Sequence, residues 1–389
     1  MKSRANRKSL RVISLFSGAG GLDLGLEAAG FSTSICVEID PVCCSTLKKN
    51  RDWLVFNSPV EKIKGRTLLK QAGLKRGEPA LLVGGPPCQP FSKSGYWRDG
   101  DSKRLKDPRA RTLGEFMRML EETLPHAFIL ENVEGLNYEG KDEGFRLVKR
   151  KLAQINKRTG ANYSFNWKKL NSVDFGVPQI RERIFIVGIR GGKVFQFPEP
   201  FCHAEQPVTS QRHIRTTWDA IGDLDGEHHA HIPSKVGGSW GALLPTIPEG
   251  QNYLWHTERG GGRPLFEWRS RFWSFLLKLA KSQPSWTIQA QPGTATGPFH
   301  WKNRKLTDRE LARIQTFPDD FDFSGSHTQI QKQIGNAVPC LLGEVLGRSV
   351  LSQVFGIQNP TKLELLPPKR RTIPSPTPIS RVPSRFLRR

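Results

Sequence analysis

Cys88 is the residue of this chain whose type and setting most clearly suggest chemistry. It sits in the middle of the segment 84–92, which reads Gly-Gly-Pro-Pro-Cys-Gln-Pro-Phe-Ser. The apolar run Leu81–Val83 is typical of a buried strand, and the glycines and prolines after it predict a stiff loop. A thiolate is a strong nucleophile, but a free thiol is mostly protonated at neutral pH. A catalytic site would have to activate the thiol or its substrate; a buried structural cysteine is the alternative.

A carboxylic acid and two arginines also flank apolar runs. Glu131 follows the run 127–130, and Arg181 and Arg183 come directly before the run 184–189. Cys88 and Glu131 therefore both fall just after predicted strands, where ligands bind in open α/β sheets. For the two arginines, a phosphate contact or an ion pair with Glu182 is the alternative to a catalytic role.

A glycine-rich turn near the N-terminus suggests a nucleoside-binding site. The apolar strand 12–16 is followed by the turn 17–21, a helix from about residue 22 to 29, and a second strand that ends in Glu38. Glycines let the backbone approach a ligand closely, and an acid at the end of the second strand can accept hydrogen bonds from ribose hydroxyls. The turn alone is a weak signal, and Glu38 could equally be a solvated acid, but together they favour a nucleoside cofactor.

The order of the predicted elements indicates an α/β protein with a doubly wound, Rossmann-like sheet. Strands and helices alternate over residues 12–189, which gives a first domain of residues 12–194. Residues 195–300 are rich in Gly, Pro, His and Trp and predict a smaller irregular domain. We expect a hinge and return segment at 301–332, where Thr307 and Glu310 form a capping box, and a final helix at 333–358 that completes the first domain.

The composition favours a polyanionic partner and a reducing compartment. The chain has 389 residues and a formal net charge of +23, much of it in a basic tail at 1–11 and a basic, proline-rich tail at 359–389 that we expect to be disordered. The six cysteines form no Cys-x-x-Cys pair, which argues against a disulfide framework. No apolar run approaches the roughly 20 residues of a membrane span, and the histidines at 228, 229 and 231 lack metal-ligand spacing.

Taken together, these segments resemble the DNA (cytosine-5) methyltransferases of bacterial type. The matching blocks appear in the family's order and cover residues from about 12 to 350. They are 16–21, 85–92, 131–133, the Gln-x-Arg-x-Arg block at 179–183, 304–318 and 335–339. One departure concerns residues 57–61, Asn-Ser-Pro-Val-Glu, where many relatives carry an acid that holds the adenine amino group and this chain has no acid at the expected position.

The resemblance implies a mechanism and a cofactor. Cys88 would add to carbon 6 of cytosine, Glu131 would protonate ring nitrogen 3, and Arg183 would donate to the ring carbonyl and steer Cys88. Arg181 joins this catalytic set, although holding the loop or the backbone suits it better. The methyl donor would be S-adenosyl-L-methionine, with no metal, in a pocket formed by Phe16, Gly18, Gly20, Leu22, Glu38, Ile39, Pro86, Asn336 and Val338.

The resemblance also implies double-stranded DNA as the partner. The target base would be flipped out of the helix, the loop 99–111 could close over the DNA, and residues 195–300 would act as a target-recognition domain. Candidate DNA contacts are Gln89, Ser92, Arg109, Arg111 and Gln179. We expect a monomer in the bacterial cytosol, associated with the nucleoid, that belongs to a restriction-modification system whose endonuclease acts separately.

Two other functions stay open at this point. The same chemistry could act on RNA, and the chain could be a catalytically silent DNA-binding module. An adenine amino-methyltransferase is disfavoured because that reaction needs no cysteine nucleophile.

Overall fold

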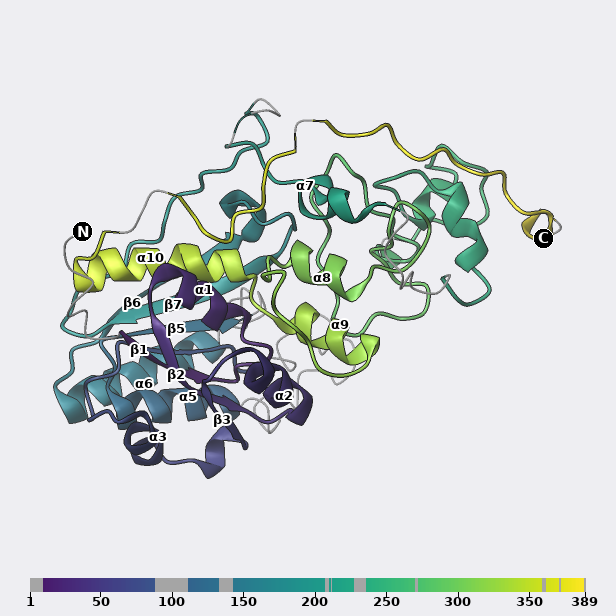
Figure 1. Ribbon diagram of the computed structural model, residues 1–389. Helices are drawn as coiled ribbons and strands as arrows, with labels where there is room; N and C mark the ends of the chain where they lie inside the picture. Colours follow the sequence, from purple (N-terminus) through teal and green to yellow (C-terminus); the bar gives the residue numbers. More distant parts are fainter. Residues whose placement is uncertain are drawn as a thin grey trace.

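A seven-stranded sheet forms the centre of the molecule (Figure 1). The computed structural model describes residues 10–87, 111–132, 143–206, 210, 212–226, 236–269, 272–358, 362–370 and 372–387. The strand order is β3-β2-β1-β4-β5-β7-β6, with parallel pairing from β3 to β5 and antiparallel pairing of β7 with both β5 and β6. The strands are β1 (Arg11–Leu15), β2 (Ser32–Glu38), β3 (Leu54–Asn57), β4 (Leu81–Gly84), β5 (Ala127–Asn132), β6 (Ser164–Asn171) and β7 (Glu182–Ile189). This is the doubly wound α/β sheet that the sequence predicts.

Helices cover both faces of the sheet, because the buried strands alternate their apolar side chains between two clusters. Val12 packs with α1 (Gly21–Ala29) and α10 (Cys340–Phe355) on one face. Its neighbour Ile13 packs on the other face, together with helices that lie below the sheet in Figure 1. Those helices are α3 (Gly65–Ala72), α5 (Arg111–Thr123) and α6 (Glu143–Thr159).

Helices α1 and α10 approach each other closely because Gly25 has no side chain. A Cβ atom at Gly25 would lie 2.2 Å from the carbonyl oxygen of Cys340. This contact fixes the C-terminal helix of the chain against the first helix. The segment that precedes α10 is thereby brought to the same edge of the sheet as the glycine turn before α1.

The predicted final helix is wrong in its extent, because the chain forms two helices there. Helix α9 (His327–Asn336) ends at Asn336, with Ala337 as its C-cap, and α10 begins after Pro339, which acts as its N-cap. Proline has no amide hydrogen and cannot continue a helix from the preceding turn.

Within the described residues, the stretch 327–355 is the one that is long and apolar enough to cross a membrane, and most of its apolar window is buried inside the protein.

Glu131 also differs from its predicted position. It lies inside β5 and not after it, because β5 continues for as long as β7 offers backbone partners. Glu131 is aligned with Phe185, and Asn132 with Ile184.

The capping box is confirmed: Thr307 Oγ1 accepts from the amide of Glu310 at 3.1 Å, and the Glu310 carboxylate accepts from the amide of Thr307 at 2.8 Å. It begins α8 (Asp308–Ile314).

Residues 195–300, which we call the irregular region, contain only short helices and isolated bridges in their described parts. The helices are α7 (Thr217–Ile221), η7 (Gly222–Leu224), η8 (Gly241–Thr246) and η9 (Tyr253–His256). A separate apolar cluster holds this region together, with Leu243, Leu244 and Leu276 at 0% exposure. A second cluster joins it to the first helix and to α8 and α9.

The C-terminal segment is ordered over 362–370 and 372–387, in contrast to the disorder expected from its composition. We call these residues the strap; Figure 1 shows it in yellow, running from the side of α10 to the far end of the irregular region. Lys369 Nζ lies 2.8 Å from the buried carboxylate of Asp219, and the amide of Thr377 donates to Glu249 at 2.7 Å. Near its end, Phe386 stacks on Trp240 with ring centroids 5.7 Å apart. Contacts with Asp219 and Glu249, two buried acids far away in the sequence, thus order the strap, whose own sequence shows no helix or strand pattern.

Candidate active site

A cavity of about 460 Å³ opens at the carboxyl ends of β1, β4 and β5. This is the point at which the strand order reverses between β1 and β4, where ligands bind in doubly wound sheets. Its wall comprises residues 14–18, 21–23, 38–40, 43, 84–87, 131–132, 181, 183, 332–333 and 335–338. Eight of the nine residues predicted to hold the cofactor lie on this wall.

The exception is Gly20, which lies in the glycine turn but packs against the second helix and does not line the cavity. Phe16, Gly18 and Gly20 all adopt positive φ angles, of 55°, 54° and 78°. A Cβ atom at Gly20 would lie 2.8 Å from Leu47 Cδ2, so the glycine faces the packing against α2 (Pro41–Asn50). Gly18, in contrast, has nothing within 4 Å of a Cβ position and leaves its side of the turn open.

Glu38 ties the glycine turn to the start of α2. One carboxylate oxygen accepts from the amide of Gly18 at 2.7 Å, and the other accepts from the amides of Ile39 and Asp40, each at 2.8 Å. Ile39 is 64% exposed, an unusual state for an isoleucine on a cavity wall. Asn57 donates to the carbonyl oxygen of Ile39 at 2.9 Å and occupies the end of β3, where the sequence lacks the expected acid.

Glu131 and Arg183 form an ion pair on the opposite side of the cavity. Arg183 Nε lies 3.0 Å from Glu131 Oε1, and their side chains are 18% and 12% exposed. The antiparallel register of β5 and β7 creates this pair from residues far apart in sequence. Burial raises the pKa of Glu131, and the charges of Arg183 and Arg181 partly oppose that shift. A Cβ atom at Gly85 would lie 2.8 Å from Glu131 Oε2, so glycine is needed where the loop passes over the carboxylate.

Arg181 contacts the backbone of the cavity wall. It is 1% exposed, and its Nη2 donates to the carbonyl oxygen of Gly335 at 2.9 Å. This bond connects the strand that carries Arg183 to the segment 335–338 on the cavity wall. The Nε and Nη1 atoms of Arg181 have no partner among the described residues.

Gln179 does not lie where DNA could reach it. Its side chain is 0% exposed, and its Oε1 accepts from the amide of Ile288 at 3.1 Å. Residues 178–180 also exchange backbone hydrogen bonds with Ser285. The predicted DNA contact is therefore replaced by a structural one, which anchors the irregular region to the wall that carries Arg181 and Arg183.

Four predicted residues lie outside the described part of the chain: Cys88, Gln89, Ser92 and Arg109. Pro86 and Pro87, the residues directly before Cys88, line the cavity. Arg111, the remaining predicted DNA contact, is the first residue of α5 and is exposed. No cluster of potential metal ligands occurs among the described residues.

Sequence reasoning missed an ion pair on the cavity wall. Lys332 Nζ on α9 lies 2.8 Å from Asp40, and the hydrogen bond between them lowers the pKa of Asp40 and raises that of Lys332. Asp40 could have been noticed as an N-cap before Pro41, and it does accept from the amide of Val42 at 3.0 Å. Lys332 carries no comparable local signal.

Asp23, a second missed residue, is buried on the cavity wall. It accepts from Ser14 Oγ at 3.0 Å and from Thr33 Oγ1 at 3.3 Å, and it is 1% exposed. Burial raises the pKa of Asp23 to about 7, although the two hydroxyl hydrogen bonds oppose the shift. Its position in an otherwise apolar helix face gave no indication of this.

Sequence comparison decides the family. The profile of the C-5 cytosine-specific DNA methylases matches residues 10–352. This chain belongs to that family. It is therefore a DNA (cytosine-5-)-methyltransferase, as the sequence blocks indicated.

Individual relatives agree over nearly the whole chain. The type II methyltransferase M.SacI of Streptomyces achromogenes is 39% identical over 379 residues, which covers 89% of this chain and 93% of the relative. The type II methyltransferase M.NgoFVII of Neisseria gonorrhoeae is 31% identical over 349 residues, covering 88% and 86%.

Solved structures share the fold. A crystal structure of a putative DNA modification methyltransferase encoded within a prophage of E. coli superposes with a TM-score of 0.63 at 22% identity, covering 90% of this chain and all of the other. The Dnmt2 methyltransferase of S. pombe gives a TM-score of 0.57 at 16% identity, again over 90% of this chain.

Proposed function

We propose that this methyltransferase works by adding the Cys88 thiolate to carbon 6 of a cytosine that is flipped out of duplex DNA. The observation that carries the proposal is the Glu131–Arg183 ion pair, which shares a cavity wall with Pro86 and Pro87. Cys88 is bonded to Pro87, and we propose that its thiol acts at the wall that holds the acid and the arginine.

The residue types match the electronic demands of the reaction. Carbon 5 of cytosine is a poor nucleophile until a thiolate adds to carbon 6, which forms a sulfur–carbon bond and turns the ring into an enamine. Glu131 donates a proton to nitrogen 3 and so neutralises the charge that develops there. Arg183 donates a hydrogen bond to the ring carbonyl. Loss of the carbon-5 proton after methylation, elimination of the thiolate and return of the nitrogen-3 proton to Glu131 restore the aromatic ring and the free enzyme.

The raised pKa of Glu131 suits this role. A carboxyl group that keeps its proton at higher pH than an ordinary glutamate can deliver it to a weakly basic ring nitrogen. Arg183 limits that shift, so the carboxylate that remains after proton transfer is also stabilised by an ion pair. The pair can thus accommodate both protonation states of the acid.

The cavity fits S-adenosyl-L-methionine, which supplies an electrophilic methyl group when bound. Phe16 and the exposed face of Ile39 offer apolar surface to a purine, and the open side of Gly18 allows close backbone approach. Asn336 and Val338 supply the wall that Arg181 holds in place through Gly335. Glu38 lies on the same wall, where its carboxylate can also accept from ribose hydroxyls.

The substrate we propose is a specific sequence in double-stranded DNA. The net charge of +23 favours a polyanion, and the irregular region is held next to the catalytic wall by the Gln179–Ile288 contact. We assign sequence recognition to this region. Since the curated relatives are named type II methyltransferases, we also propose that the enzyme protects DNA against a separate restriction endonuclease in a bacterial cytosol.

Bisulfite sequencing of plasmid DNA from cells that express the protein tests the proposal. We expect 5-methylcytosine at one recurring sequence, and none in cells that express Cys88→Ser. Transfer of a labelled methyl group to purified plasmid and to tRNA, measured in parallel, separates DNA from RNA as the substrate. Methylation of tRNA alone, or unchanged activity of Cys88→Ser, would contradict the proposal.

A further inference from the structure

One acid on the cavity wall lacks a partner that balances its charge. The described part of the wall carries four acids: Asp23, Glu38, Asp40 and Glu131. Two of them form the ion pairs with Lys332 and Arg183, and Glu38 accepts from three backbone amides. Asp23 accepts from two neutral hydroxyl groups and forms no ion pair within the part of the chain that the structure describes. An ionised Asp23 is therefore left without a cation of the protein.

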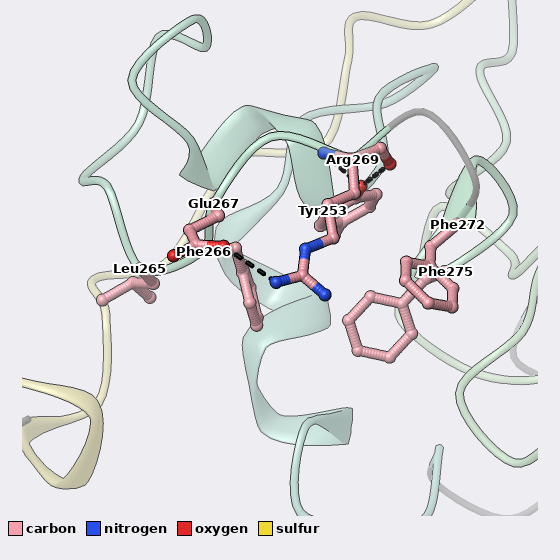
Figure 2. Close-up of a pocket in the computed structure, with 7 residues that line it drawn as sticks. All are labelled: Tyr253, Leu265, Phe266, Glu267, Arg269, Phe272 and Phe275. Atoms are coloured by element: carbon pink, nitrogen blue, oxygen red, sulfur yellow. Dashed lines mark hydrogen bonds and ion pairs between the residues drawn. The ribbon is translucent and has the colours of Figure 1, made fainter.

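An acid on a different groove shows the more usual arrangement. Glu267 lines a groove of the irregular region, where Figure 2 shows it beside Arg269. Arg269 Nη2 lies 2.8 Å from the Glu267 carboxylate, and the Glu267 side chain is 81% exposed. Protein and solvent both balance that charge. Asp23 has neither kind of compensation, since it is 1% exposed.

The titratable groups packed around Asp23 supply no positive charge to it. On the same helix, Glu27 is an acid that pairs with Arg51 at 2.8 Å, and its charge raises the pKa of Asp23. Cys36 on β2 and Cys340 on α10 are buried thiols, and burial raises the pKa of each well above its ordinary value. Both thiols therefore stay neutral at physiological pH.

The cations on the described cavity wall serve other groups. They are Arg181, Arg183 and Lys332. The last two belong to the ion pairs given above, and Arg181 donates to the carbonyl oxygen of Gly335. The charge of Arg181 acts on Glu131, whose raised pKa it partly opposes. A positively charged ligand in the cavity would therefore supply the cation that Asp23 lacks.

A chain of hydroxyl groups connects Asp23 to the cavity. Ser17 Oγ donates to Ser14 Oγ at 2.9 Å, and Ser14 Oγ donates to Asp23 Oδ2 at 3.0 Å. Both serines line the cavity. Because a hydroxyl group both donates and accepts, this chain can carry a proton between the carboxyl group and the cavity in either direction. Asp23 also lies in the first turn of α1, where the helix dipole favours a negative charge.

We propose that Asp23 distinguishes the methyl donor from its product by charge. The sulfur of S-adenosyl-L-methionine is positively charged, whereas that of S-adenosyl-L-homocysteine is a neutral thioether. When the donor binds, Asp23 gives its proton to solvent through Ser14 and Ser17, and the carboxylate left behind attracts the donor's charge. After methyl transfer that attraction is gone, and the carboxylate takes a proton back from solvent. This inference rests on the proposed function and adds a specificity-determining residue to its cofactor site.

Proton release on binding is the first test. Isothermal titration calorimetry in two buffers of different ionisation enthalpy counts the protons that leave when S-adenosyl-L-methionine binds the wild type. We expect about half a proton per donor at about pH 6.5, since a unit charge within about 10 Å lowers a carboxyl pKa by roughly one unit at an effective dielectric constant of about 20. S-adenosyl-L-homocysteine should release none, and the release should be absent from Asp23→Asn.

The preference for donor over product is the second test. In the wild type, the ratio of the two dissociation constants should favour the donor about tenfold more at pH 8 than at pH 5, relative to Asp23→Asn. The preference rises with pH because the donor favours the ionised carboxylate, and it levels off above about pH 7, where free Asp23 is itself ionised. Glu267→Gln, the matched control, removes an acid that already has a cation and should keep the wild-type ratio at every pH.

Two results would overturn the inference while leaving the proposed function intact. A wild type that methylates DNA could bind the donor without releasing a proton. Alternatively, the ratio of dissociation constants could follow the same pH profile in the wild type and in Asp23→Asn. If the wild type binds neither donor nor product, the proposed cofactor site itself fails.

Discussion

At the scale of single residues, the site depends on how burial changes the protonation of two acids. Glu131 and Asp23 both lie on the cavity wall, and burial raises the pKa of each. Glu131 forms an ion pair with Arg183, whereas Asp23 accepts hydrogen bonds from the hydroxyl groups of Ser14 and Thr33. The first acid is therefore suited to exchanging a proton in a reaction, and the second to carrying one as part of the folded structure.

Replacement of Glu131 should slow methyl transfer without removing the cofactor site. A glutamine keeps the shape but cannot donate an acidic proton, so Glu131→Gln should lower kcat by about 10²- to 10⁴-fold. Single-turnover transfer from labelled S-adenosyl-L-methionine measures the effect. Glu61→Gln, at an exposed position in η1 (Val60–Lys62), serves as the control. A fall of less than about threefold would remove Glu131 from the reaction.

Asp23 should make stability depend on pH. The folded-state pKa of Asp23 is about 7, against an ordinary value of 3.8. At pH values between these two, Asp23 therefore keeps its proton in the folded protein and loses it in the unfolded chain. The free energy of unfolding should therefore fall as pH rises through this window and level off above it. Relative to Asp23→Asn, the wild type should lose about 3 kcal/mol between pH 5 and pH 8, measured by urea unfolding. Parallel pH profiles for the two proteins would contradict the assignment.

At the scale of elements, distant segments are locked to one another by buried charges. Glu344 on α10 accepts from the strap amides of Glu364 at 2.8 Å and Leu365 at 2.9 Å. Further along the strap, Lys369 pairs with Asp219 in the irregular region, with side chains 3% and 0% exposed. The strap thus connects the last helix over the sheet to the region that we propose reads DNA.

Loss of the Lys369 charge should be costly. Lys369→Met would leave Asp219 buried without its cation, and breaking a buried pair in this way costs about 3–5 kcal/mol. The free energy of unfolding in urea measures the loss. Lys70→Met, at an exposed position of α3, should change it by less than about 0.5 kcal/mol. An equally small effect of Lys369→Met would mean that the strap contact adds no stability.

The elements that could be predicted from sequence are those defined by local pattern. Apolar runs predicted five of the seven strands, β1, β2, β4, β5 and β7, and the Thr307–Glu310 spacing predicted the capping box. What could not be predicted depends on partners far along the chain. The Asp40–Lys332 pair joins residues 292 positions apart, and Gln179 became structural only because Ile288 folds against it. The break between α9 and α10 was signalled by Pro339, but the apolar pattern around it suggested a single helix.

At the scale of the whole molecule, one sheet edge gathers segments from nearly the full length of the chain. The cavity wall takes residues from 14 to 338, and Glu131 and Arg183 come to it from different strands. The irregular region and the strap lie to one side of this edge (Figure 1), where a long polyanion could contact both parts at once. The distribution of positive charge over body and tails fits such an extended partner.

The central claim is a covalent bond between the Cys88 sulfur and carbon 6 of the target base. A duplex with 5-fluorocytosine at the mapped site should trap it after methyl transfer, because fluorine cannot leave carbon 5 as the proton does. Incubation with S-adenosyl-L-methionine, followed by denaturing electrophoresis and peptide mass spectrometry, should give a protein–DNA adduct located at Cys88. Absence of that adduct from an enzyme that fully methylates the unsubstituted duplex, or an adduct at another residue, would contradict the mechanism.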